Sequence, residues 1–269
     1  MITIGIDPIL INLGPFSLAW HSLFATIGLG VGVWLPAYLT ARAGLSVDRL
    51  LNIALWGIPG GIIGARLVHV IDYWDLYMAN PGTILAIHKG GLALWGGILG
   101  GILAVLIYAR VRKISIAAYA DQLAPGMILA QAIGRIGDII NGEHISKSIG
   151  LPWGVIYTHP NSPSYGLPPS HLAVGYELLM DLVIFGVLWK LRGRVKPDSA
   201  IFLLYLVTYS TGRFLLSFLR LDSNTVLLGI NQAQWLSLIV LVVALPMLLF
   251  RLASQRKQTQ GNSPAGSEV

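Results

Sequence analysis

The sequence predicts an all-α, polytopic integral membrane protein of about seven transmembrane helices. Of its 269 residues, 55% are apolar and 11% are charged, and the mean hydropathy is +0.70. Soluble globular domains carry about 25% charged residues, so we expect lipid to be the main solvent of this chain. Seven apolar runs approach the roughly 20 residues that cross a bilayer core. They cover residues 16–40, 51–71, 92–109, 123–140, 172–191, 200–219 and 233–250.

The first run has neither the basic lead-in nor the small-residue cleavage site of a removable signal peptide, so we expect it to remain in the mature protein. Residues 1–253 are predicted to form a single transmembrane domain. Residues 254–269, which are rich in Gln, Ser and Gly, are predicted to form a disordered cytoplasmic tail.

The distribution of Lys and Arg predicts the orientation. With the N-terminus outside and the C-terminus in the cytoplasm, most basic residues between the spans lie inside, for example Arg110 and Arg192, whereas Lys89, Lys147 and Arg220 lie outside. This is the arrangement that the positive-inside rule favours. The formal charge of +6 therefore indicates orientation and contact with the cytoplasmic leaflet, and we expect no nucleic-acid partner.

Glycine spacing predicts close helix packing in the second and third spans. Glycines four residues apart occur at Gly57/Gly61, Gly60/Gly64, Gly96/Gly100 and Gly97/Gly101. Small residues at this interval let helix backbones approach closely. Tight packing explains the pattern, and a functional alternative is a smooth wall that leaves room for lipid chains.

The fourth span carries polar residues on one helical face: Gln131, Arg135, Asp138 and Gly142. Gly126, Ala130 and Gly134 form an opposing edge of small residues. A long outer segment follows, about 30 residues from Asn141 and rich in Gly, Pro, Asn and Ser; loops of this length are usually functional or mobile.

Three arginines, Arg66, Arg135 and Arg213, are predicted to lie at membrane depth in the outer half of their spans. An arginine there is costly unless it is paired or faces a wet cavity. One explanation is separate structural ion pairs, for which Asp138, Glu177 and Asp181 are the available carboxylates. The other is a shared anionic phospholipid head group, because guanidinium groups match phosphate oxygens bidentately. Their common depth favours the head group.

The chain has no cysteine, which excludes disulfides, thiolate metal sites and a protein thiol nucleophile. Any thiol in the chemistry must therefore belong to the substrate. The six histidines show no i, i+4 pair with a carboxylate between them. We expect no metal and no cofactor.

Several segments resemble the prolipoprotein diacylglyceryl transferase family. The segment GRIGDIINGE from Gly134 to Glu143 is similar to the family signature, usually GRIGNFINGE. GARLVHV from Gly64, GGLALWGGILGG from Gly90, Tyr176-Glu177 and YSTGRFLLSFLR from Tyr209 resemble further family motifs in the same order. The resemblance extends over most of residues 16–250.

This resemblance implies transfer of the diacylglyceryl group of phosphatidylglycerol to the lipobox cysteine of a prolipoprotein signal peptide, which forms a thioether and releases glycerol 1-phosphate. It also implies a multi-pass protein of the bacterial plasma (inner) membrane, surrounded by membrane lipid, with its active site toward the outer leaflet. Arg135, Arg213 and His21 would be catalytic. The substrate-binding residues would be Arg66, Trp95, Gly134, Asp138, Asn141, Glu143 and Tyr209.

Four positions depart from the family pattern: His21, Trp95, Asp138 and Ser217 stand where the family often has Tyr, His, Asn and Glu. The alternatives are therefore a divergent active enzyme, a paralogue that binds anionic phospholipid without transferring it, or a small-anion transporter. A retinal-type receptor would need a lysine in the last span, which has none. The general base stays open among His21, the preferred residue, His88 and His144, and a thiol that ionises near the arginines would need no base.

Overall fold

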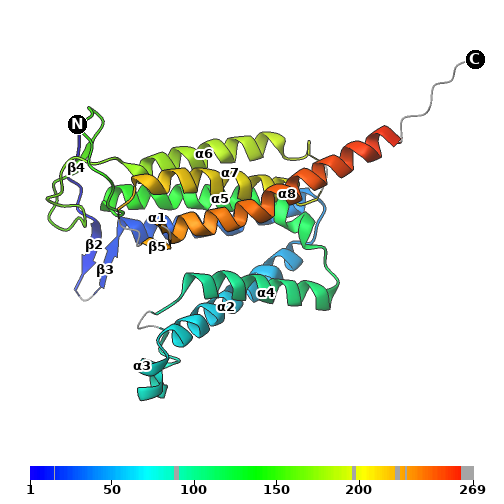
Figure 1. Cartoon of the computed structure of the whole chain (residues 1–269), viewed down its shortest axis with the longest axis horizontal. Helices are drawn as coiled ribbons and strands as arrows, with labels where there is room; N and C mark the ends of the chain where they lie inside the picture. Colours follow the sequence, from blue (N-terminus) through cyan, green and yellow to red (C-terminus); the bar gives the residue numbers. More distant parts are fainter. Residues whose placement is uncertain (15, 88–90, 196–197, 222–224, 228, 262–269) are drawn as a thin grey trace, which may run out of the picture. The chain divides into compact units, whose positions relative to one another are not determined.

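The computed structural model describes the chain except residues 15, 88–90, 196–197, 222–224, 228 and 262–269 (Figure 1). His88 and the start of the third-span motif at Gly90 therefore lie outside the described residues. The described part is mostly helical and forms two compact units, residues 1–36 with 120–269 and residues 37–119. Helix α1 (Trp20–Arg42) begins in the first unit and ends in the second.

The first unit contains the long helices α5 (Ile116–Asn141), α6 (Ala173–Leu191), α7 (Ala200–Leu216) and α8 (Gln232–Gly261), which run alongside one another in Figure 1. A short 3-10 helix, η3 (Ser217–Leu219), extends α7. Side chains from α5, α6 and α7 form a buried apolar core; they are Ala124, Ile128, Ile184, Leu188, Ile201 and Tyr205. The core lies toward one end of these three helices, and the polar residues Arg135, Glu177 and Arg213 lie toward the other end.

Asp121, a residue of α5, caps the start of α7. Its carboxylate accepts hydrogen bonds from the backbone amides of Ser199 and Phe202, each at 2.8 Å. The first amides of a helix have no partner inside it, and Ser199 makes no side-chain cap of its own. Asp121 therefore fixes where α7 starts relative to α5.

Short strands form the remaining part of the first unit. Strand β1 (Ile2–Ile4) pairs in parallel with β4 (Val155–Tyr157), which lies in the long loop between α5 and α6. Strands β2 (Ile9–Leu13) and β3 (Phe16–Ala19) form an antiparallel hairpin that leads directly into α1, and β5 (Thr225–Leu227) pairs with β6 (Ile230–Asn231). The loop between α5 and α6 is thus tied to the N-terminus by backbone hydrogen bonds.

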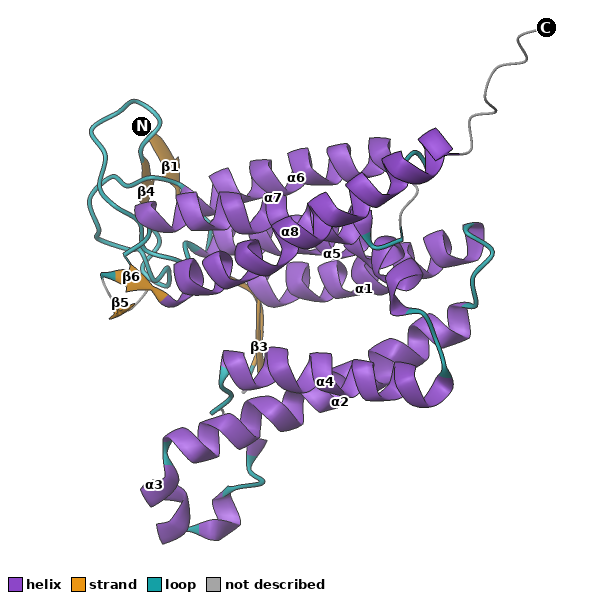
Figure 2. Cartoon of the chain, turned by 45° about the vertical axis from the view of Figure 1, so that its right-hand side comes forward, coloured by secondary structure: helices purple, strands orange, loops and turns teal. Residues whose placement is uncertain are grey.

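The second unit consists of α2 (Val47–Asp72), α3 (Trp74–Ala79), η1 (Pro81–Thr83) and α4 (Leu94–Arg112). Helices α2 and α4 lie side by side (Figure 2). A Cβ atom on Gly64 would overlap the carbonyl oxygen of Gly96, and one on Gly100 would overlap that of Gly60. The predicted close packing of these two spans is confirmed.

Six described helices are long and apolar enough to cross a membrane: α1, α2, α4, α5, α7 with η3, and α8. The seventh predicted span corresponds to α6, a helix of 19 residues that carries Glu177, Asp181 and Lys190. The prediction of a polytopic all-α membrane protein is confirmed, with α6 set apart by these charges. Helix α8 continues through Gly261, past residue 254, where the predicted tail begins, and residues 262–269 lie outside the described part.

Candidate functional site

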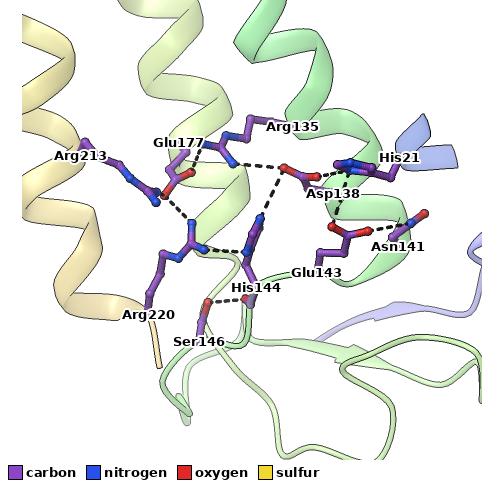
Figure 3. A network of polar contacts seen from close by, with 10 residues as sticks. All are labelled: His21, Arg135, Asp138, Asn141, Glu143, His144, Ser146, Glu177, Arg213 and Arg220. Carbon is purple, nitrogen blue, oxygen red and sulfur yellow. Dashed lines mark hydrogen bonds and ion pairs between the residues drawn. The ribbon is translucent and has the colours of Figure 1, made fainter. Parts of the chain in front are cut away.

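Three arginines converge on the buried carboxylate of Glu177, whose side chain is 1% exposed (Figure 3). Arg135 Nη2 lies 2.8 Å from Glu177 Oε2, Arg213 Nη1 hydrogen-bonds Oε1, and Arg220 Nη1 lies 3.4 Å from the same oxygen. We call Arg135, Arg213, Arg220 and Glu177 the arginine cluster. Three guanidinium groups around one carboxylate leave an excess of positive charge in a poorly solvated place, and Asp138 and the buried Asp181 partly offset it.

Each member of the arginine cluster sits near the end of a helix. Arg135 lies in the last two turns of α5, Glu177 in the first two turns of α6, and Arg213 in the last turn of α7. Arg220 follows η3, where backbone bonds from Lys147 N to Leu219 O and from Leu221 N to Ile145 O hold its segment against the loop between α5 and α6. The cluster therefore lies at the loop end of the bundle.

Asp138, one turn after Arg135 on α5, connects the arginine cluster to a histidine. Its Oδ2 lies 3.1 Å from Arg135 Nη1, and its Oδ1 lies 2.6 Å from His21 Nδ1. A carboxylate of this kind accepts, so Nδ1 of His21 carries the proton and Nε2 keeps its lone pair. The His21 side chain is 44% exposed.

Gly137 brings His21 to this position. A Cβ atom on Gly137 would lie 2.7 Å from the Cα atom of His21, so a larger residue would push α1 away from α5. The same two helices approach closely at Gly28 and Ala130, and at Pro36 and Gly126. The predicted small-residue edge of the fourth span is confirmed at Gly126 and Ala130, whereas a Cβ on Gly134 would meet no heavy atom within 4 Å.

Asn141 and Glu143 lie beside the His21–Asp138 pair. Asn141 Nδ2 donates to Glu143 Oε1 at 3.0 Å, and Glu143 Oε2 lies 3.6 Å from His21 Nδ1. Ligand atoms of His21, Asp138 and Glu143 lie within 4.8 Å of one another, a grouping that could hold a metal ion. The Arg135 guanidinium at Asp138 opposes a cation there, so the arrangement favours a hydrogen-bonded network.

His144 has the opposite proton arrangement from His21. Arg220 Nη2 donates to His144 Nδ1 at 2.6 Å. A guanidinium group only donates, so Nδ1 must accept and Nε2 carries the proton of the neutral ring. That Nε2 lies 3.8 Å from Asp138 Oδ2, and both ring nitrogens of His144 are therefore directed at protein groups.

Tyr209 and Asp181 lie around the arginine cluster. Tyr209 on α7 stacks on Tyr205 with ring centroids 5.8 Å apart, and Gln131 of α5 donates to Tyr205 Oη at 2.7 Å. Asp181, one turn after Glu177 on α6, is fully buried, and neither of its oxygens has a hydrogen-bond partner in the described part of the chain. Both Tyr209 and Asp181 are close enough to Arg135 and Arg213 to interact with their charges.

Arg66 and Trp95 belong to the second unit. The Arg66 side chain donates to the carbonyl oxygens of Ile84 at 2.7 Å, Gly91 at 2.9 Å and Thr83 at 2.7 Å. Its guanidinium carbon lies 4.9 Å from the centre of the Tyr77 ring. Trp95, in the first turn of α4, is half-buried. These contacts give Arg66 the geometry of a residue that holds the segment after α2.

The structure brings together most of the predicted site residues: His21, Arg135, Asp138, Asn141, Glu143 and Arg213, with Tyr209 and Gly134 on the same helices. Two partners were not assigned roles from sequence, Arg220, which was placed in an outer loop, and Glu177, which was considered only as an ion-pair partner. Arg220 follows Arg213 by seven residues, two helical turns, so the helical period could have indicated its position.

Comparison with known proteins gives a consistent result. The sequence model of the prolipoprotein diacylglyceryl transferase family matches residues 8–250. A phosphatidylglycerol–prolipoprotein diacylglyceryl transferase of Dehalococcoides mccartyi is 33% identical over 97% of this chain and 99% of its own length. Proteins of the same name from a Nostoc species and from Staphylococcus aureus are each 34% identical, over 93% and 91% of this chain and 90% and 89% of their own.

Proposed function

Because this chain belongs to the prolipoprotein diacylglyceryl transferase family, we propose that it transfers the diacylglyceryl group of phosphatidylglycerol to the cysteine thiol in the lipobox of a prolipoprotein. The cysteine sulfur bonds to the glyceryl carbon as the bond from that carbon to the phosphate oxygen breaks. The thiol gives its proton to a base of the enzyme. The products are a thioether and glycerol 1-phosphate.

The observation that carries this proposal is the convergence of Arg135, Arg213 and Arg220 on Glu177 beside an accessible histidine. In the reaction, negative charge grows on the leaving phosphate. Guanidinium groups that are already positioned stabilise such charge without reorganising during the reaction. We assign Arg135 and Arg213 to the phosphate because both lie closer to Glu177 than Arg220 does, and Arg220 Nη2 donates to His144 instead.

The His21–Asp138 pair is the proposed general base. Asp138 orients the imidazole through Nδ1 and stabilises the positive charge that the ring gains, as the carboxylate does in a catalytic triad. His21 Nε2 then accepts the thiol proton. His144 is a poorer candidate because its Nδ1 accepts from Arg220 and its Nε2 already carries a proton, so that the neutral ring has no free lone pair.

Glu143, Asn141 and Tyr209 are proposed to orient the substrates around this centre, with Gly134 and Trp95 in contact with lipid. Arg66 was predicted to bind substrate; we propose that within the second unit it holds the segment after α2, since its donors are directed at backbone carbonyls. None of these roles requires a metal or cofactor.

The protein is a multi-pass membrane protein, and we propose that it lies in the bacterial plasma membrane with the arginine cluster toward the outer leaflet. The Lys and Arg distribution supports this orientation. The chain has no cysteine, so a single cysteine introduced at the exposed Ser148 can report its side. Labelling of intact cells by a membrane-impermeant maleimide is expected at residue 148, and a cysteine at Arg192 is expected to react only after lysis; the reverse would overturn the orientation.

The direct test uses purified protein, phosphatidylglycerol and a peptide with a lipobox cysteine. We expect the peptide to gain the mass of a diacylglyceryl group and glycerol 1-phosphate to be released. His21→Gln should abolish most of the rate and remove a limb of the pH–rate profile, whereas His144→Gln should keep that limb. A profile unchanged by His21→Gln would exclude His21 as the base.

Two alternatives are separated by the same experiment. A paralogue that only binds anionic phospholipid would retain phosphatidylglycerol without modifying the peptide. A small-anion transporter would be expected to have broken helices that meet at mid-membrane. Helix α5 instead runs unbroken from Ile116 to Asn141, and its arginine lies near one end, which favours the transferase.

A further inference from the structure

Three hydroxyl groups of the outer loop hold the carbonyl oxygens at the end of α5. Tyr157 donates to Ile139 O at 2.8 Å, Ser162 to Asn141 O at 2.8 Å and Ser164 to Gly142 O at 2.7 Å. The last carbonyls of a helix have no partner within it, and here the loop supplies them. We call Tyr157, Ser162 and Ser164 the hydroxyl clamp.

The segment that the clamp holds is a tight left-handed turn. Gly142 has φ 73°, and the amides of Gly142 and Glu143 both donate to Asp138 O, at 3.0 and 3.1 Å. A Cβ atom on Gly142 would overlap Ser162 Oγ and lie 2.7 Å from a ring carbon of Tyr157. The turn therefore fits against the clamp with no space between them, and only glycine meets both demands.

This turn sets the position of the groups beside the proposed base. Asn141 and Glu143 flank Gly142, Asn141 Nδ2 donates to Glu143 Oε1, and Glu143 Oε2 lies 3.6 Å from His21 Nδ1. A continuous set of contacts thus leads from Ser162 and Ser164, through the turn, to His21. The two serines are buried, with 5% and 7% exposure, so water does not readily replace their hydroxyl groups.

Tyr157 is suited to the same task. Burial raises the pKa of the Tyr157 hydroxyl to about 12, above the ordinary value of about 10. The phenol therefore remains a hydrogen-bond donor throughout the pH range in which the enzyme would work. Pairing of β4 with β1 holds the backbone of Tyr157 opposite Ile4, which anchors the clamp to the N-terminus.

We propose that the hydroxyl clamp consists of positioning residues for the transfer reaction: it fixes the 141–143 turn so that Asn141 holds Glu143 beside His21. This inference rests on the proposed function. The outer loop would then support catalysis by holding the backbone carbonyls of the turn, and the clamp residues would not touch the substrate.

The test compares Tyr157→Phe, Ser162→Ala and Ser164→Ala with Ser148→Ala. Ser148 is an exposed serine of the same loop, and its substitution should leave the rate unchanged. Each clamp variant should lower kcat by about tenfold to a hundredfold, the scale on which small misplacements act, with little change in the KM for phosphatidylglycerol. Ser164→Thr, which keeps the hydroxyl group, should retain most of the activity.

A double-mutant cycle tests whether the clamp acts through Glu143. If it does, Ser164→Ala should cost much less in a Glu143→Gln background than in the wild type, because coupled residues are not additive. Full additivity, or unchanged kcat in all three clamp variants, would overturn the proposal. Tyr157→Phe keeps the ring and serves as the reference should a serine variant fail to fold.

Amide hydrogen exchange tests the clamp by a measurement that does not depend on the transfer reaction. Amides of residues 139–145 should exchange faster in the clamp variants, while those of α7 should not. A wild-type protein that transfers nothing would refute the proposed function, and the exchange data would still report on the clamp. Unchanged exchange in this segment would refute the clamp even in an active enzyme.

Discussion

The chain holds its buried arginines in two different ways. In the arginine cluster, Arg135, Arg213 and Arg220 surround the side-chain carboxylate of Glu177. In the second unit, Arg66 donates to the backbone carbonyls of three loop residues and lies over the Tyr77 ring. One set has a charged partner on a side chain, and the other has neutral partners on the main chain.

The difference indicates what each arrangement can do. Main-chain carbonyls are fixed by the course of the chain, so the Arg66 contacts determine where the loop after α2 runs. A carboxylate presents two anionic oxygens to guanidinium groups, as a phosphate does. The guanidinium groups of the arginine cluster can therefore exchange Glu177 for a substrate phosphate and keep their hydrogen bonds. If Arg66 bound a phosphate, it would have to give up the carbonyl groups that position the segment after α2.

The largest expected effect is on Glu177. Glu177→Gln leaves three buried guanidinium groups around a neutral amide, and breaking a buried ion pair costs about 3–5 kcal/mol of stability. Thermal unfolding in detergent should show a large fall in Tm. Phosphatidylglycerol should raise Tm more in this variant than in the wild type, because the phosphate replaces the missing charge; equal shifts would argue against the exchange of carboxylate for phosphate.

Arg213→Gln is expected to act on the reaction. Removing one group that stabilises transition-state charge lowers kcat by about a hundredfold to a thousandfold. Activity is measured as mass gain of the lipobox peptide. Arg251→Gln, which removes a charge from an exposed position on α8, is the matched control and should retain the wild-type rate.

Gly64→Ala tests the packing of the second unit. The added methyl group overlaps the carbonyl oxygen of Gly96, and overpacking of this kind costs about 1–3 kcal/mol. Gly82→Ala is the control, since a Cβ there would meet nothing within 4 Å. A Gly64 variant as stable as the wild type would show that α2 and α4 can separate without penalty.

The smallest expected effect is that of Arg66→Lys. Lysine keeps the charge but cannot reach three carbonyls with a planar fork, so stability should fall by about 1–2 kcal/mol, the scale of one or two lost hydrogen bonds. The kcat of the folded protein should change less than in Arg213→Lys, measured beside it. An equal loss of kcat in the two variants would remove the distinction between the two kinds of site.

The long helices could be predicted closely from the sequence. The run at 172–191 corresponds to α6, Ala173–Leu191, and the run at 123–140 lies within α5, Ile116–Asn141. Length and apolar composition decide these segments locally, because a helix satisfies its own backbone in lipid. The starts were less accurate for α2 and α5, which begin at Val47 and Ile116, because polar residues such as Asp48 and Asp121 interrupt the apolar run near those starts.

The residues at the polar end of the bundle could be identified from the sequence, since Arg135, Asp138, Asn141 and Glu143 share one short segment, and the Arg135–Asp138 pair follows from helical spacing. Their other partners depend on the tertiary structure. Glu177, Arg220 and the hydroxyl clamp come from elements that are far apart along the chain, and helix packing brings them together. The same packing placed one nitrogen of His21 on Asp138 and one of His144 on Arg220. The proton arrangement of each ring follows from the partner it meets, which local sequence does not specify.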